Sequence, residues 1–172
     1  MTCVIGLQHR GKVWMGADSA GTDAYFNQVT RDDKKVFVKG KFILGFCGSF
    51  RMGQLLAHKL EVPNHPSGKS NMSFLVEDFM NAVKDCLNNG ESGLEPYFLL
   101  GYKGKLYEIQ GDYQVGIPKS GFASIGSGSD LAMGAMHASK HNKNPKDRIL
   151  NALTIAEQGN AAVRAPFILL SK

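Results

Sequence analysis

Hydrophobic residues in the first third of the chain occur in short runs, separated by glycine-bearing turn segments. The clearest of these turn segments are His9–Gly11 and Lys39–Lys41. Short apolar runs rich in Val, Ile and Phe between such turns predict β-strands. We expect strands at Thr2–Gln8, Lys12–Asp18, Lys35–Val38, Phe42–Cys47, Tyr97–Lys103, Leu106–Gln110, Phe122–Ile125 and Pro166–Leu170.

Other segments carry apolar residues at helical spacing. The clearest example places Leu75, Phe79 and Val83 on one face of a helix, with charged residues away from it. Later in the chain, Asn144 and Pro145 are residue types that favour the cap and the first position of a helix. We expect helices at Phe50–Glu61, Met72–Asn88, Ser129–His141 and Lys146–Gln158, with a long connection at Val62–Asn71.

The order of these elements indicates the fold class. Hairpins that alternate with helix pairs are typical of an α+β fold with antiparallel sheets, not of a doubly wound parallel sheet. We therefore expect a four-layer αββα sandwich, in which two sheets face each other between helix pairs. A chain of 172 residues without a linker or internal repeat has the length of one domain, so we predict a single domain over residues 1–172.

Composition excludes several classes of function. The net charge is +5, but the basic residues are scattered without interleaved aromatic residues, so we expect no nucleic-acid binding. The sequence has neither an apolar run of about 18 residues nor a secretory signal pattern, so we expect no membrane partner. The three cysteines cannot all pair, and their spacing fits no metal site. These features predict a reduced, cytoplasmic protein without a metal or other cofactor.

The first predicted hairpin brings candidate reactive residues together. A three-residue loop in this hairpin would place Thr2 opposite Asp18, with Cβ atoms about 5 Å apart. A one-residue error in the loop length would move the partner of Thr2 to Ser19 or Ala17. The second hairpin brings Lys35 to the same end of the molecule. We therefore predict a cluster of a threonine hydroxyl, a carboxylate and an ammonium group.

These residue types suit catalysis by an N-terminal nucleophile. Removal of Met1 would give Thr2 a free α-amine, whose reference pKa of about 7.7–8.0 suits a general base at neutral pH. This amine could take the hydroxyl proton while the oxygen attacks a carbonyl carbon. A nearby lysine would lower the pKa of the amine, and a carboxylate would hold that lysine in place. Backbone N–H groups at a glycine turn could form an oxyanion hole.

Five short motifs follow one another along nearly the whole chain: Thr2-Cys-Val-Ile-Gly-Leu, Gly16-Ala-Asp-Ser, Lys34-Lys-Val, Gly45-Phe-Cys-Gly and Ile125-Gly-Ser-Gly. In order and spacing this set resembles the proteasome β-subunit and HslV family of N-terminal nucleophile hydrolases. The resemblance implies a threonine-type endopeptidase with Thr2 as nucleophile and Asp18 and Lys35 as its charged support. It also implies that Ser127 binds the α-amine and that the Gly48 N–H group is the oxyanion donor.

The resemblance also implies how such a protein works. Family members form rings, so we expect a homo-oligomeric ring that hydrolyses unfolded polypeptides or peptides, with an ATPase unfoldase as a possible partner. Phe46 lies at the rim of the glycine turn in the sequence and is the residue that we predict to shape the substrate-binding pocket.

The sequence departs from the family near the end of the last predicted helix. Family members carry an aspartate there, a few residues before a serine or threonine, and both support the nucleophile. This chain has Gln158 at the place of the aspartate and Val163 near that of the hydroxyl, with Asn160 or Glu157 as possible replacements. A retained initiator methionine would also block the free amine. The alternative hypothesis is therefore a catalytically inactive structural or assembly protein with a proteasome-like fold.

Three other motifs carry weaker signals. Gly68–Ser70 matches the end of a phosphate-binding P-loop, but the first glycine of that motif is absent. His137 and His141 share a helix face without an evident third metal ligand. Cys47 and His58 form a possible thiol pair, but no residue would orient the histidine. We assign no function to any of the three.

Overall fold

The computed structural model describes residues 2–25, 27–88 and 94–172. The strands are β1 (Val4–His9), β2 (Lys12–Ala17), β3 (Ala20–Thr22), β4 (Gln28–Thr30), β5 (Val36–Lys39), β6 (Phe42–Phe46), β7 (Phe98–Tyr102), β8 (Lys105–Ile109), β9 (Val115–Gly116), β10 (Phe122–Ile125) and β11 (Ile168–Ser171). The helices are α1 (Phe50–Gln54), η1 (Leu55–Lys59), α2 (Asn71–Ser73), η2 (Phe74–Phe79), α3 (Met80–Leu87), α4 (Ser129–Ala138) and α5 (Pro145–Gly159), of which η1 and η2 are π-helical.

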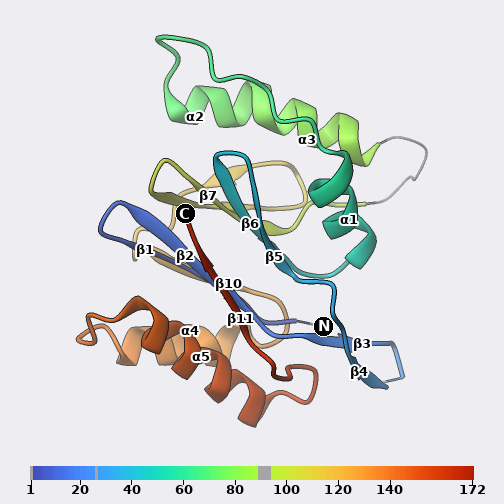
Figure 1. The fold of residues 1–172 in the computed structure, drawn as a ribbon, viewed down its shortest axis with the longest axis vertical. Coiled ribbons are helices and arrows are strands. Elements are labelled where there is room, and N and C mark those ends of the chain that lie inside the picture. The colour runs from blue at the N-terminus through green and yellow to red at the C-terminus, as the bar shows by residue number, and fades with distance from the viewer. Residues whose placement is uncertain (1, 26, 89–93) are drawn as a thin grey trace.

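These elements form the predicted four-layer αββα sandwich (Figure 1). One sheet has the strand order β10-β1-β2-β11 and the other the order β5-β6-β7-β8-β9, and the paired strands in both sheets are antiparallel. Helices α4 and α5 cover the outer face of the first sheet, and α1 to α3 cover the second (Figure 1). The α+β prediction from the element order is confirmed.

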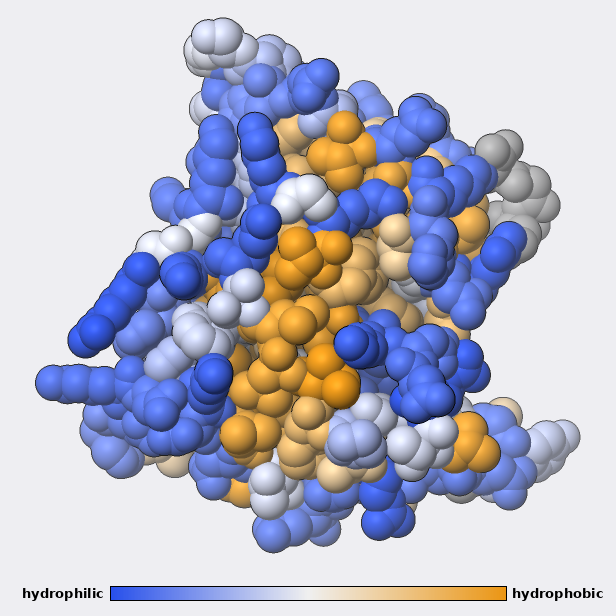
Figure 2. Space-filling view, in the orientation of Figure 1, coloured by the Kyte–Doolittle hydropathy of each residue, from blue (hydrophilic) through white to orange (hydrophobic). Residues whose placement is uncertain are grey.

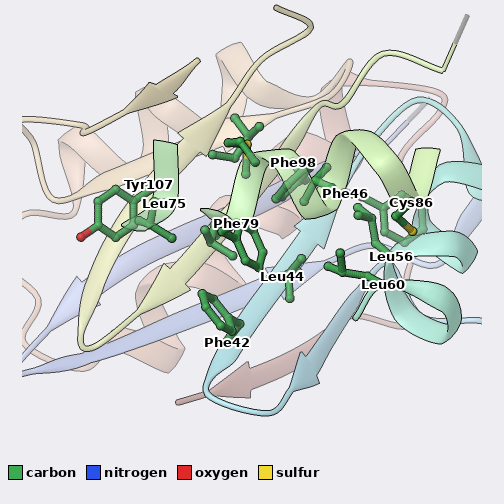
Figure 3. Close-up of a cluster of buried hydrophobic side chains, with 14 of the residues drawn as sticks. Phe42, Leu44, Phe46, Leu56, Leu60, Leu75, Phe79, Cys86, Phe98 and Tyr107 are labelled. Carbon is green, nitrogen blue, oxygen red and sulfur yellow. The ribbon is translucent and has the colours of Figure 1, made fainter. Parts of the chain in front are cut away.

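Three apolar layers hold the four structural layers together. The layer between the two sheets includes Val4, Met15, Ile43 and Leu99, which are all 0% exposed. A second layer lies under α4 and α5, and the largest lies between the β5–β9 sheet and the helices α1 to α3 (Figure 3). In this largest layer the ring of Phe42 stacks on Phe79 and Tyr102, with centroid distances of 4.6 and 4.4 Å. Because β6 and β7 are covered on both faces, all their residues are buried.

The register of the first hairpin differs from the prediction by one residue. The β1–β2 turn has two residues, Arg10 and Gly11, and both adopt positive φ, at 48° and 72°. His9 therefore pairs with Lys12, and the Asp18 N–H group donates to the carbonyl oxygen of Cys3 at 3.2 Å. The residue opposite Asp18 is thus Cys3 and not Thr2. A two-residue turn with positive φ is typical of tight hairpins, although arginine is an unusual residue for it.

The helices begin and end close to the predicted positions. The predicted helix from residue 129 to 141 ends at Ala138, because the Ser139 hydroxyl donates to the Ala135 carbonyl at 2.8 Å and a turn follows. The sequence does not predict β3, β4 and β9, which are only two or three residues long. No helix among the described residues is long and apolar enough to cross a membrane.

Candidate active site

A buried ion pair between Asp18 and Lys35 lies close to the first described residues, because the Cys3 N–H group donates to the Asp18 carboxylate. Asp18 follows β2 directly and Lys35 precedes β5 directly, so the sheets bring the two side chains to the same end. The Lys35 Nζ atom donates to Asp18 Oδ1 at 2.8 Å, and the side chains are 1% and 0% exposed. The predicted contact between the carboxylate and the lysine is therefore present.

Backbone donors hold the Asp18 carboxylate in place. The N–H group of Cys3 donates to Oδ1 at 2.9 Å, and the N–H group of Ala20 donates to Oδ2 at 3.0 Å. A longer bond of 3.4 Å comes from the Arg164 N–H group, close to the C-terminal strand. These bonds compensate the desolvation of a carboxylate that is almost completely buried. They also tie the residue after Thr2 directly to the ion pair.

The environment of Lys35 acts on its charge in two opposite ways. Burial lowers the pKa of the Lys35 ammonium group, while the Asp18 carboxylate favours the charged form. The centroid of the Phe50 ring lies 5.8 Å from Nζ. Lys35 is thus a desolvated cation held by one carboxylate, an environment of the kind that tunes charged groups at functional sites.

Thr2 is buried against the loop that precedes α4. Its N–H group donates to Ser127 Oγ at 3.3 Å, and the Ser127 hydroxyl donates to the Thr2 carbonyl oxygen at 3.4 Å. The Gly128 N–H group also donates to the Thr2 carbonyl, at 3.1 Å. Gly126 has a φ of +96°, and a β-carbon at this position would collide with the Thr2 carbonyl oxygen. The loop therefore needs glycine here to approach Thr2 closely.

Phe46 contacts Lys35 through its backbone, and Gly48 follows it two residues later in the chain. The Phe46 N–H group donates to the Lys35 carbonyl oxygen at 3.0 Å. Gly48 follows in the turn before α1 with a φ of +79°, and among the described residues, apart from its chain neighbours, no atom lies within 4 Å of where its β-carbon would be. The Phe46 ring is 4% exposed and packs beneath Gly53 of α1. The Phe46 side chain is thus part of the core, and its role in shaping a substrate pocket stays a prediction.

The segment after α5 contacts the loop that contains Ser127. The side-chain amide of Asn160 donates to the Ser127 carbonyl oxygen at 2.8 Å. Gln158 is exposed, and the Glu157 carboxylate accepts instead from the Ala165 N–H group at 2.9 Å. Of the replacements considered for the missing aspartate, Asn160 is the one that contacts Ser127. The Val163 side chain is buried in the apolar layer under α5.

A hollow that the sequence does not reveal is lined in part by Phe50, the ring that lies 5.8 Å from Lys35 Nζ. It has a volume of about 260 Å³, and its lining includes Thr22, Asp23, Arg31 and Phe50. The Arg31 guanidinium lies 4.0 Å from the centroid of the Phe50 ring, which in turn neighbours Lys35. The sequence could have placed Phe50 at the start of a helix, because Ser49 before it is a residue type that caps α1. It could not have placed Arg31, because the position of Arg31 depends on β3 and β4, which the sequence does not predict.

The other candidate motifs have structural roles. Lys69 of the P-loop-like segment forms ion pairs with Glu77 and Asp78. His137 packs edge-on against the ring of Phe122. The described part of the chain contains no group of three or more His, Cys, Asp or Glu side chains that could hold a metal ion. Burial raises the pKa of the Cys47 thiol to about 12, which makes this thiol a poor nucleophile.

Sequence comparison finds no relative, but comparison of structures does. No protein-family model and no curated protein sequence matches the chain. The structure of BPH from Thiobacillus denitrificans in complex with epoxomicin matches with a TM-score of 0.79 and 16% identity, over 99% of this chain and 98% of that chain. HslV from Trypanosoma brucei matches with a TM-score of 0.72 and 17% identity, over 99% and 98% of the two chains.

A third match is a Gly-1 mutant of Anbu from Hyphomicrobium sp. strain MC1. Its TM-score is 0.70 at 15% identity, and the match covers 98% of this chain and 80% of that chain. Identities at this level say nothing about activity, but the TM-scores establish a common architecture over nearly the whole chain. Together with the two facing sheets and their helix layers, these matches identify the protein as having the proteasome-like fold of the N-terminal nucleophile hydrolases.

Proposed function

We propose that the chain is a threonine-type endopeptidase that becomes active when Met1 is removed. The observation that carries this proposal is the buried Asp18–Lys35 pair. Its carboxylate accepts a hydrogen bond from the N–H group of Cys3, the residue that follows Thr2. An ion pair with almost no exposed surface contributes little net stability, because desolvation offsets most of the attraction. A role in charge stabilisation at a reaction site explains better why a lysine is buried there.

The proposed reaction proceeds in two halves. The Thr2 α-amine accepts the hydroxyl proton while Oγ attacks the peptide carbonyl carbon, and the resulting oxyanion accepts a hydrogen bond from the Gly48 N–H group. The tetrahedral intermediate then expels the amine of the leaving peptide, which takes the proton from the α-ammonium group. A water molecule attacks the remaining ester with the α-amine as its base, and the carboxylic acid leaves as Thr2 Oγ regains its proton.

The surrounding residues take supporting roles in this proposal. The positive charge on Lys35 lowers the pKa of the α-amine and keeps part of it unprotonated at neutral pH. Ser127 accepts a hydrogen bond from the Thr2 nitrogen, and Asn160 holds the backbone of Ser127. We propose that the hollow at Arg31 and Phe50 receives a substrate side chain. The substrate would be an unfolded polypeptide or a peptide, delivered in the cytoplasm by an ATPase partner.

One observation favours the alternative, an inactive structural protein with this fold. Where the resemblance leads us to expect an aspartate and a hydroxyl group, the chain has the exposed, neutral Gln158 and the buried Val163. Neither can accept a proton, and Val163 cannot donate a hydrogen bond from its side chain. Under this hypothesis the fold would serve assembly alone, and Thr2 would stay joined to Met1.

Two measurements decide between these functions. Intact-mass analysis of the purified protein shows whether Met1 is present. On protein that lacks Met1, we expect epoxomicin to add its mass to a peptide that begins with Thr2, and fluorogenic peptides to be cleaved. The Thr2→Ala variant should lose labelling and turnover, because it keeps the amine but lacks the oxygen nucleophile. Thr2→Ser should retain part of both, because it keeps the hydroxyl.

Thr154→Ala serves as the control, because this threonine is exposed on α5 and its hydroxyl donates to the Leu150 carbonyl of the same helix. It should leave labelling and turnover unchanged. Turnover that persists in Thr2→Ala would disprove the assignment of the nucleophile. If the protein lacking Met1 were neither labelled nor active, the inactive structural protein would be the better hypothesis.

A further inference from the structure

Hairpin turns with the same composition recur in the chain. In each of them a glycine stands between two basic residues, as Arg10-Gly11-Lys12, Lys39-Gly40-Lys41 and Lys103-Gly104-Lys105. They connect β1 to β2, β5 to β6 and β7 to β8. We call the six basic residues of these turns the basic turn cluster. None of the three segments contains an acidic residue, so the cluster concentrates positive charge.

The two sheets bring these turns together at one end of the molecule, away from the N-terminus (Figure 1). Gly104 lies so close to Gly11 that a β-carbon at position 104 would collide with the Gly11 carbonyl oxygen. A cavity of about 310 Å³ lies between the turns, lined by Gly11, Lys41, Gly101, Tyr102, Lys103, Gly104 and Lys172. Figure 2 shows this end, at the left, as largely hydrophilic with several long projecting side chains.

Most of the charge in the cluster has no counter-charge. Among the described residues, no member of the basic turn cluster forms an ion pair. Lys39 donates to the Ala57 carbonyl oxygen at 2.7 Å, and Lys103 donates to the Asn71 side-chain oxygen at 3.2 Å. Both partners are neutral, so they leave the positive charge uncompensated. Like charges gathered in this way repel one another and favour an anionic partner.

The conformation of the turns does not explain why they are basic. Arg10 has a φ of 48° and Lys103 a φ of 46°, a region that glycine, asparagine and aspartate adopt more readily. Tight hairpin turns of this kind favour Asn-Gly or Asp-Gly. Both turns instead carry the less favourable residue, and in both cases it is a cation. The charge is therefore present in spite of the local backbone preference.

We propose that the basic turn cluster binds an acidic segment of a partner protein. Carboxylates of a flexible acidic peptide would enter the cavity beside Lys41 and Lys103, and Arg10, next to the cavity-lining Gly11, would add to the positive potential there. Single-stranded nucleic acid would need exposed aromatic rings for stacking, but Tyr102 in the cavity wall is only 2% exposed. A lipid surface would need apolar side chains that insert, whereas glycine backbone and lysine stems form most of the cavity lining. The cluster is distant from Thr2, so this proposal does not depend on peptidase activity.

The test uses a fluorescein-labelled peptide of twelve glutamate and serine residues, with binding followed by fluorescence anisotropy on the full-length protein. We expect binding at low salt that weakens as salt rises, because exposed ion pairs are screened. The double variant Arg10→Asn/Lys103→Asn should bind about tenfold more weakly, since two cations are lost. Asparagine suits the positive φ, so this variant should fold, which a thermal melt followed by circular dichroism verifies.

The matched control is Lys84→Asn/Lys140→Asn, which removes the same charge from exposed positions outside the cluster. Its affinity should stay within about twofold of that of the unmodified protein. An equal loss of affinity in both double variants would show that only net charge matters, and the proposal would fail. It would fail equally if a duplex RNA or vesicles rich in phosphatidylserine bound more tightly than the peptide and showed the same dependence on Arg10 and Lys103.

Discussion

At the scale of single residues, we expect the loss of either partner of the Asp18–Lys35 pair to destabilise the fold strongly. Each charge is stable in the interior only because the other is 2.8 Å away. Replacement of Lys35 by methionine would leave the Asp18 carboxylate buried without its counter-ion. We expect Lys35→Met to lower the free energy of unfolding by about 3–5 kcal/mol and to abolish peptide turnover. Urea denaturation and a fluorogenic peptide assay measure the two effects.

The neighbouring lysine provides the control for this prediction. Lys34 is exposed, so Lys34→Met should change the free energy of unfolding by no more than about 0.5 kcal/mol. If the two variants were equally stable, the ion pair would not have the energetic role that its burial indicates.

The buried thiols give a prediction about pH at the same scale. Burial raises the pKa of Cys3 and of Cys47 from 9.0 to about 12. The unfolded chain therefore loses these protons near pH 9.0 and the folded protein only near 12. Their contribution to stability is complete below pH 9.0 and is lost as the pH rises towards 12. We expect iodoacetamide at about pH 8 to leave both thiols unmodified in the folded protein and to alkylate them in urea, as read by mass spectrometry.

An exposed thiol would behave differently, so alkylation of the folded protein at a rate equal to that in urea would contradict the burial of both side chains. A Cys47→Ala variant extends the test. It should show a smaller fall in the free energy of unfolding between pH 9 and 11 than the unmodified protein, because one of the raised pKa values is removed.

At the scale of elements, two glycines in different surroundings should respond oppositely to alanine. Gly104 has a φ of +72° and no room for a β-carbon, since the Gly11 carbonyl of the other sheet lies against it. Gly134 is exposed in the middle of α4, and outside that helix no described residue has an atom within 4 Å of the β-carbon position. We expect Gly104→Ala to destabilise the fold by more than about 1 kcal/mol and Gly134→Ala to stabilise it by about 0.5–1 kcal/mol. Thermal melts compare them, and a neutral Gly104→Ala would show that the turns are not in contact.

At the scale of the whole molecule, an apolar surface favours association of several copies. Strands β5 and β11 lie at the edges of their sheets, and Figure 2 shows apolar surface over the region of these strands. Val38 of β5 is 45% exposed, and Ile168 and Leu170 of β11 are only partly buried. A continuous apolar surface of this kind is typical of an interface. Together with the ring that the family resemblance implies, it leads us to propose a homo-oligomer with this side as a contact.

We expect light scattering to give the mass of six or more subunits at micromolar concentration, as a ring requires. Val38→Glu should shift the protein to smaller species, because it places a charge in the proposed contact. Val76→Glu is the matched control, since Val76 is 49% exposed on η2 at another surface. A monomer in the unmodified protein, or the same shift in both variants, would contradict the proposed interface.

The sequence by itself determined the order of the elements and the αββα class. Glycine turns, strand-like apolar runs and helical spacing are local features, so the positions of β1, β2, β5 and β6 follow from the residues they contain. The same local reasoning placed Asp18 and Lys35 at strand ends that meet, and their contact is observed at 2.8 Å. The catalytic roles of these residues remain predictions.

The tertiary structure decided whatever depends on distant partners or on the choice of one turn. The first hairpin loop has two residues instead of the predicted three, because Arg10 adopts a positive φ. Cys3 and not Thr2 therefore lies opposite Asp18. Phe46 has a sequence position at a loop rim, but its ring fills the space beneath Gly53 of α1. Asn160 contacts Ser127, which lies 33 residues earlier in the chain. Sequence patterns describe which face of an element is apolar, whereas these contacts depend on how whole layers pack, so only the folded structure shows them.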